Sequence, residues 1–98
     1  MSPAEVLETL LALCREAGLE VRQLPRPRNP VDSGEPAVRS GVCRVRGALW
    51  LVLSGADGLE ERISAAAGAL RRFAPDLVEG RYLPPAVRQR LGAGPGAS

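Results

Sequence analysis

The spacing of apolar residues predicts a helix over residues 3–17. One set of apolar side chains recurs at helical spacing and would form a broad stripe: Val6, Leu7, Leu10, Leu11, Cys14 and Ala17. Ser2 and Glu5 have the spacing of a capping box around Pro3, which suits the first helical turn. Gly18 is typical of a helix end, because glycine adopts a left-handed backbone at little cost.

A second amphipathic helix is expected over residues 59–73. Its apolar positions share one face: Leu59, Ile63, Ala66, Ala67, Leu70 and Phe73. Asp57 and Gly58 precede it as a capping signature, and Pro75 would end it. Gly68 interrupts this helix at a cost of about 1 kcal/mol relative to alanine. We interpret the run of small residues around Gly68 as a close approach to the first helix or to the sheet.

Three further segments have the patterns of β-strands. Residues 20–24 carry a β-branched anchor, whereas residues 41–46 alternate in polarity. Residues 48–53 are apolar on both faces, which is typical of a shielded, central strand. Gly47 supplies a turn, so the second and third strands are expected to form a hairpin.

The strand at residues 41–46 distributes its side chains between two faces. Cys43 and Val45 point one way, and Cys43 is expected in the core, as is Trp50. The other face holds Val42, Arg44 and Arg46. Arg22 joins these two arginines if residues 20–24 lie alongside. We expect helices to cover one sheet face only, which leaves this partly apolar, partly cationic face exposed.

The pattern as a whole predicts a small α+β domain over residues 1–91. It has a sheet of about three strands, two main helices packed on one face, and a short C-terminal helix at residues 84–91. The proline-rich residues 25–39 read as a surface loop, and residues 76–83 as a connector with a short extended segment. Residues 92–98 are expected to form a disordered tail.

Composition makes several functions improbable. All 13 basic residues among the 98 are arginine, and 11 acidic residues leave a net charge of +2, a weak electrostatic footprint for nucleic acid. This arginine usage, with many Ala, Gly and Pro, is typical of a GC-rich bacterial genome. There is no apolar run long enough for a membrane span and no signal-peptide pattern, so a cytoplasmic protein is expected. Cys14 and Cys43 are expected as buried free thiols.

Residue types that carry catalysis are scarce. The chain contains no histidine, no G-x-S-x-G sequence and no phosphate-binding glycine loop. Glu60 and Glu61 are adjacent in the second helix and would point about 100° apart, so we assign them to its positive end. We therefore expect no enzymatic activity, no cofactor and no metal site.

One family resemblance points the same way. From about Ala4 to Leu70 the order is helix, strand, loop, hairpin and helix, and residues 59–64 (LEERIS) begin that last helix. This arrangement resembles the N-terminal part of the ImmA/IrrE-type zinc peptidases, whose corresponding helix bears a His-Glu-x-x-His motif. The resemblance places Ala67, Gly68 and Arg71 at the three motif positions, and none of them can ligate zinc. It implies a peptidase-like scaffold without a catalytic site.

Three functional hypotheses follow. The first is a non-enzymatic protein–protein interaction module, or a small homo-oligomer, that uses its exposed sheet face. The alternative is a nucleic-acid-binding accessory module in which arginines contact phosphates. The second alternative is a catalytically inactive relative of a zinc peptidase. The candidate contact residues in the first two are Arg22, Arg44 and Arg46.

Overall fold

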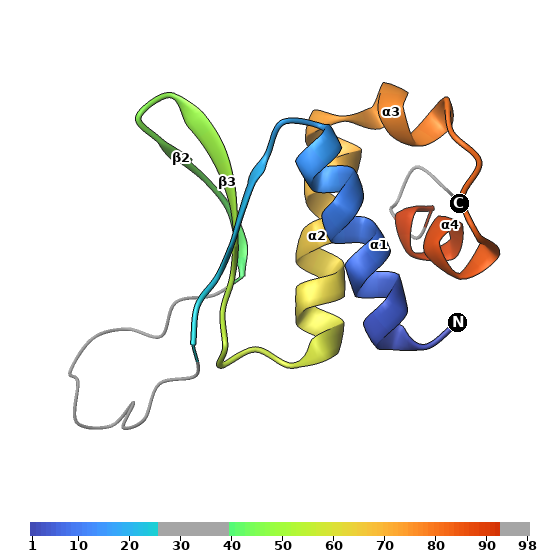
Figure 1. Cartoon of the computed structure of the whole chain (residues 1–98), viewed down its shortest axis with the longest axis horizontal. Helices are drawn as coiled ribbons and strands as arrows, with labels where there is room; N and C mark the ends of the chain where they lie inside the picture. The colour runs from blue at the N-terminus through green and yellow to red at the C-terminus, as the bar shows by residue number, and fades with distance from the viewer. Residues whose placement is uncertain (26–39, 93–98) are drawn as a thin grey trace.

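The computed structural model describes residues 1–25 and 40–92, which form a three-stranded mixed sheet and four helices (Figure 1). In chain order the elements are α1 (Pro3–Glu16), β1 (Glu20–Gln23), β2 (Gly41–Val45), β3 (Ala48–Leu53), α2 (Leu59–Phe73), α3 (Pro75–Glu79) and α4 (Pro85–Leu91). The predicted α+β class is therefore confirmed. The predicted loop at 25–39 and tail at 92–98 fall almost wholly outside the described residues.

The described elements lie in layers. In Figure 1 the sheet is on the left, α1 and α2 form the middle, and α3 and α4 are on the right. Helix α1 contacts β1, whereas α2 contacts both β2 and β3. Helix α4 packs against α1 and α2 on the side away from the sheet. The prediction that the two main helices cover one sheet face is confirmed.

The sheet has the strand order β1-β3-β2, so β3 is its central strand, as predicted. Strand β1 runs parallel to β3, with Val21 opposite Leu51. Strand β2 runs antiparallel to β3 and is joined to it by the two-residue turn Arg46-Gly47. Both turn residues have positive φ, 50° and 83°. This geometry matches the type I′ turn, whose twist fits a hairpin, and it removes Arg46 from the strand in which it was predicted.

Helix α1 begins and ends as its sequence predicts. The Ser2 hydroxyl accepts a hydrogen bond from the Glu5 amide at 3.2 Å, and the Glu5 carboxylate accepts one from the Ser2 amide at 3.2 Å. The hydrogen bond from the Ser2 amide lowers the pKa of Glu5, because it favours the charged carboxylate. Gly18 follows the helix with φ 92°, a backbone conformation that favours glycine.

The core lies between the sheet and the helices. On β3, Leu51 and Leu53 are buried beneath α1 and α2, with exposed fractions of 0% and 1%. They meet the apolar stripes of the two helices: Val6, Leu7, Leu10, Leu11, Cys14, Ile63, Ala66, Ala67 and Leu70. Val42 and Leu49 pack against this core from their strands. Val42 is therefore on the covered face, not on the exposed face to which the alternation assigned it.

Helix α2 differs from its prediction at two positions. Gly58, not Asp57, is the N-cap, and no side chain caps the helix. The Asp57 carboxylate instead accepts a hydrogen bond from the Ser40 amide at 2.8 Å, which ties the start of β2 to the β3–α2 connection. Gly68 makes no close approach, since a Cβ there would meet only an Arg71 side-chain nitrogen at 3.9 Å. The interpretation of Gly68 as a packing requirement is wrong.

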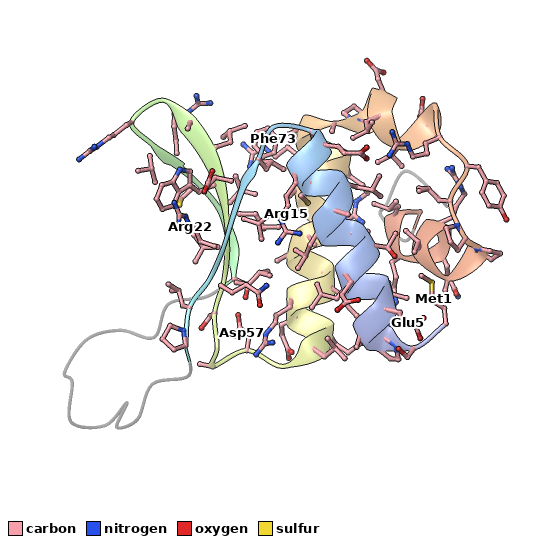
Figure 2. The ribbon with its side chains drawn as sticks, in the orientation of Figure 1. Met1, Glu5, Arg15, Arg22, Asp57 and Phe73 are labelled. Carbon is pink, nitrogen blue, oxygen red and sulfur yellow. The ribbon has the colours of Figure 1, made fainter. Side chains whose placement is uncertain are left out.

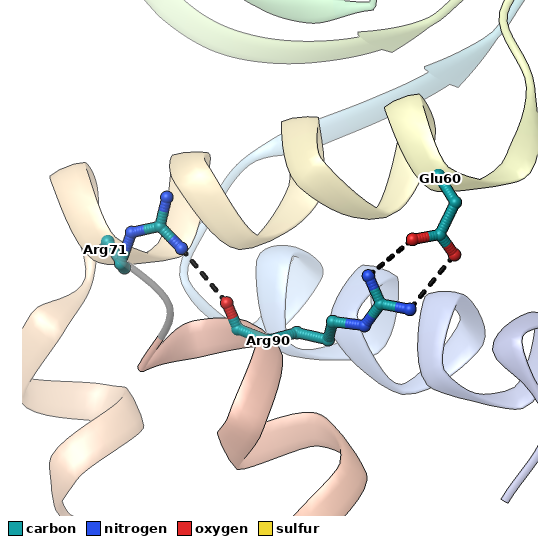
Figure 3. Close-up of polar contacts among 3 residues, drawn as sticks. All are labelled: Glu60, Arg71 and Arg90. Atoms are coloured by element: carbon teal, nitrogen blue, oxygen red, sulfur yellow. Dashed lines mark hydrogen bonds and ion pairs between the residues drawn. The ribbon is translucent and has the colours of Figure 1, made fainter. Parts of the chain in front are cut away.

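The C-terminal part is more helical than predicted. Residues 75–79 form α3 where a connector with an extended segment was expected, whereas α4 and its buried Val87 and Leu91 agree with the prediction. Arginines fasten α4 to α2 (Figure 3). Arg90 binds the Glu60 carboxylate through two nitrogens, at 2.6 and 3.0 Å, and Arg71 donates to the Arg90 carbonyl at 3.2 Å. Arg71 thus satisfies a carbonyl at the C-terminal end of α4.

Within the part of the chain that the structure describes, no helix is long and apolar enough to cross a membrane.

Candidate interaction surface

The sheet face opposite α1 and α2 is not covered by any described element. Side chains alternate along a strand, so Trp50 and Val52 of β3 point away from the side on which Leu51 and Leu53 are buried. Figure 2 shows Arg22 of β1 on this same side, away from the helices. We call this surface the open sheet face; its side chains are Glu20, Arg22, Cys43, Val45, Ala48, Trp50 and Val52.

Trp50 lies at the centre of the open sheet face. The register places it on the central strand between Glu20 of β1 and Cys43 of β2. Trp50 and Val52 are half-buried, although they belong to the middle strand of the sheet. Within residues 1–25 and 40–92, neighbouring strands shield these two side chains but no second layer covers them, which accounts for their remaining exposure.

Arg22 covers part of the Trp50 ring. Its guanidinium carbon lies 4.8 Å from the ring centroid, a cation–π distance that contributes about 0.5–1 kcal/mol at an exposed site. The same guanidinium is 3.0 Å from the Glu20 carboxylate, and both side chains are about half exposed. An exposed ion pair of this kind contributes little to stability, so the pair orients Arg22 more than it holds the sheet together.

The three arginines predicted as a contact set do not lie together. Arg22 belongs to β1 and to the open sheet face. Arg44 belongs to β2, at the opposite edge, and its register partner Leu49 lies on the helix-covered face. Arg46 lies in the hairpin turn. The reason is topological: β1 pairs with β3 and not with β2, so strands β1 and β2 are separated by the whole central strand.

Two residues predicted in the core lie elsewhere. Trp50 is on the open sheet face, and Cys43 is an exposed free thiol on the same face. The sequence held a signal for both placements. Leu51 and Leu53 are the best aliphatic partners for the apolar helix stripes, and strand alternation then places Trp50, with its cross-strand partner Cys43, on the opposite face.

The other cysteine, Cys14, is buried, as predicted. Cys14 of α1 is fully enclosed, and its thiol donates a weak hydrogen bond to the Ala66 carbonyl of α2 at 3.8 Å. Burial raises the pKa of this thiol to about 11 because the thiolate would lose its hydration. Cys14 is therefore a thiol near neutral pH and a packing residue between α1 and α2.

An open hollow of about 700 Å³ lies beside the start of α2. Polar and acidic residues and one alanine line it: Ser40, Asp57, Glu60, Glu61, Ser64 and Ala65. The Glu60 carboxylate is engaged by Arg90, which lowers the pKa of Glu60, and Asp57 accepts from Ser40. Across residues 1–25 and 40–92, no three His, Cys, Asp or Glu side chains are grouped so that they could hold a metal ion.

Comparison with known proteins adds no assignment: no protein-family model, no curated protein and no solved structure matches this chain. The resemblance to the zinc peptidases therefore rests on the sequence pattern alone. At the positions it equates with the zinc motif, Ala67 is buried in the core and Arg71 binds the end of α4. Gly68 lies between them, and an added Cβ there would meet an Arg71 side-chain nitrogen at 3.9 Å.

Proposed function

We propose that this chain is a non-enzymatic protein–protein interaction module, and that its open sheet face binds an amphipathic helix of another protein. The observation that carries the proposal is the position of Trp50: a half-buried tryptophan at the centre of an uncovered sheet face, with Arg22 over its ring. Tryptophan and arginine are, with tyrosine, the residue types most enriched among those that dominate binding energy at protein interfaces.

A helix suits this face because of how the sheet is built. Strand β3 is apolar on both sides, and β1 pairs with it in parallel, features typical of a sheet with helices on both faces. In this chain α1 and α2 cover one face, and a partner helix on the other would complete the α/β/α layering.

The size of the open sheet face also favours a helix over a large rigid partner. Three strands about 4.8 Å apart and a six-residue central strand with a rise of about 3.3 Å per residue give a footprint of roughly 300 Å². A standard stable interface buries roughly 800 Å² on each partner. A helix of about 13 residues, roughly 20 Å long and 10 Å wide, matches the footprint.

The nucleic-acid alternative gains no support from the geometry. Arg22 and Arg44 lie on opposite faces and at opposite edges of the sheet, so they form no common phosphate-binding surface. Nucleic-acid binding is therefore kept as an outcome that the experiment must be able to reveal.

The test is comparative capture from cell lysate, with and without nuclease treatment, using four forms of the chain. These are the wild type, Trp50→Ala, Arg22→Ala and, as the matched control, Tyr82→Ala, which removes an 86% exposed aromatic between α3 and α4. We expect one protein to be retained by the wild type and Tyr82→Ala and lost with both open-face variants. Equal retention by all four forms would contradict the proposal, and material lost on nuclease treatment would favour nucleic acid.

Once the captured protein is identified, a peptide is synthesised that covers its predicted amphipathic helix. Trp50 is the only tryptophan in the chain, so its fluorescence reports on the open sheet face directly. We expect a blue shift of Trp50 emission on titration with the peptide and none with a peptide whose apolar stripe is replaced by serine. An unshifted emission at saturation would place the contact elsewhere.

A further inference from the structure

We infer that two copies of this chain associate through the free edge of β2, in antiparallel register about Cys43, to form one six-stranded sheet. The strand order makes β2 an edge strand among the described elements. Edge strands present unpaired amide and carbonyl groups, which makes them templates for a further strand. This inference goes beyond the helix-binding face, because it concerns a different surface and a different partner.

The hairpin geometry identifies the backbone groups of β2 that no described strand pairs. A two-residue hairpin turn closes on a hydrogen-bonded pair, which here is Val45 and Ala48, and such pairs alternate along an antiparallel ladder. Gly41, Cys43 and Val45 therefore direct their backbone groups toward β3. The amides and carbonyls of Val42 and Arg44 are left directed at the free edge.

A hydrogen bond on the β1 side of β3 supports this assignment of which residues face which neighbouring strand. The Leu24 amide donates to the Leu53 carbonyl at 2.8 Å, so the backbone groups of Leu53 face β1. By alternation, the odd-numbered positions of β3 face β1, and the even-numbered positions, Ala48 and Trp50 among them, face β2. This agrees with the pairing derived from the turn.

One register uses every free group of this edge. Strand β2 has five residues, and its midpoint is Cys43, so full antiparallel overlap with a second copy centres there. Val42 then forms a hydrogen-bonded pair with Arg44 of the other copy, twice by symmetry, which satisfies all four outward groups of each chain. The register also opposes Arg44 to valine, whereas centring on Arg44 would set like charges directly opposite.

The edge has only part of the usual protection against such pairing, namely its short length and one charged side chain, Arg44. Strand β2 contains no proline or lysine, and its terminal residues are Gly41 and Val45. The same register brings the two Cys43 residues together as a non-hydrogen-bonded pair, with Cα atoms about 4.5 Å apart. That separation is within the range for a disulfide, so the exposed Cys43 thiol serves as a reporter of the register.

The first test is the mass of the folded chain in solution. Wild type is expected at twice the 10.3 kDa of one chain by light scattering. Arg44→Pro removes an outward amide without touching the β2–β3 ladder, and it should give the monomer mass. Arg44→Ala is the matched control, since it removes the same side chain but keeps the amide, and it should remain dimeric. A monomeric wild type, or a dimeric Arg44→Pro, would overturn the inference.

The second test needs no proline variant. Diamide joins two thiols by accepting their two electrons and two protons, and it should convert the wild type to a covalent dimer that reductant reverses. In the double variant Cys43→Ser, Val45→Cys, the new thiol is on the same side of the sheet as Cys43. In the proposed register, however, it lies opposite Gly41 of the other copy. Its distance from its symmetry mate is about 13 Å, too far to bridge. Equally fast crosslinking of the wild type and the double variant would indicate random collision and would contradict the proposed register.

The two proposals can fail separately. Trp50→Ala should keep the dimer mass and the Cys43 crosslink while it loses the captured partner. Arg44→Pro should lose the dimer mass and keep an emission shift with the helical peptide. Loss of both properties in either variant would show that edge and face are not separate surfaces.

Discussion

The two faces of β3 are built from the same kind of residue and yet differ in their environment. Leu51 and Leu53 are buried beneath α1 and α2, whereas Trp50 and Val52, which alternate with them, are only half-buried. The difference therefore does not come from hydrophobicity. It comes from the number of layers that the described chain supplies, which is enough to cover one face.

A strand that is apolar on both faces can therefore indicate an interface as well as a core. Each covered side chain gains the full free energy of leaving water, roughly 25 cal/mol per Å² of apolar surface. The side chains of the open sheet face gain only part of it. A partner that covers Trp50 and Val52 would gain the rest, which is the physical basis of the proposed helix binding.

The largest expected change in the free energy of unfolding comes from substitutions at two adjacent positions of β3, one on each face of the sheet. Leu51→Ala leaves a cavity under both helices and should lower the free energy of unfolding by about 2–5 kcal/mol. Val52→Ala removes fewer atoms from a half-buried site and should cost about 1 kcal/mol or less. Urea denaturation of the two variants measures both values. Similar losses would mean that the open sheet face is covered in solution, as by a second layer.

A smaller effect is expected on the helical side, with the opposite sign. Gly68→Ala should raise the free energy of unfolding by about 1 kcal/mol, because alanine favours the helix and, apart from the helix's own backbone, its methyl group would meet only an Arg71 nitrogen at 3.9 Å. Gly18→Ala is the matched control and should destabilise, since Gly18 has φ 92°. Thermal unfolding of both variants shows whether each substitution raises or lowers the stability relative to the wild type. A destabilised Gly68→Ala would restore the close approach that the sequence pattern suggested.

The smallest effect is a pH dependence confined to the helical layers. The Arg90 hydrogen bonds lower the pKa of Glu60 below its ordinary value of 4.5 in the folded chain. The folded state therefore binds this proton more weakly than the unfolded state, so the contact stabilises above pH 4.5 and is lost as the pH falls through the lowered value. Glu60→Gln should lower the unfolding temperature slightly at neutral pH and have no effect in acid.

The control for this titration lies in the same turn of α2. Glu61→Gln removes an equal charge without removing the contact to Arg90, so its effect should be smaller at neutral pH. A wild-type difference from Glu60→Gln that persisted well below pH 4 would show that the carboxylate acts by packing and not by its charge. At any one pH, Trp50 fluorescence should be the same in both variants and in the wild type, because the open sheet face is on the other side of the sheet from Glu60 and Glu61.

Local signals made most of the fold predictable from the sequence. The capping box at Ser2 and Glu5, the glycine after α1 and the proline-led α4 each depend on neighbouring residues, and each was predicted correctly. The hairpin was predicted for the same reason, since Gly47 and the flanking apolar runs are close in sequence. Asp57 was misassigned as a cap because its partner, Ser40, is 17 residues away.

The candidate surface was predicted less well because it depends on strand order. The sequence indicated one uncovered sheet face, but not which side of each strand belonged to it. Choosing the side required knowing that β1 pairs with β3, which places Arg22 beside Trp50 and away from Arg44. Nothing in the local pattern distinguishes that order from one in which β1 pairs with β2.

The strand order also has a consequence for the sequence of folding events. In the hairpin, Val45 pairs with a residue three positions away, whereas Val21 pairs with Leu51, thirty positions away. Closing the longer loop costs more chain entropy, and pairings distant in sequence form more slowly. We therefore expect β3 to acquire β2 early and β1 late, so that the β3 edge of the newly formed hairpin, as well as the β2 edge, is exposed to other chains until β1 pairs with β3.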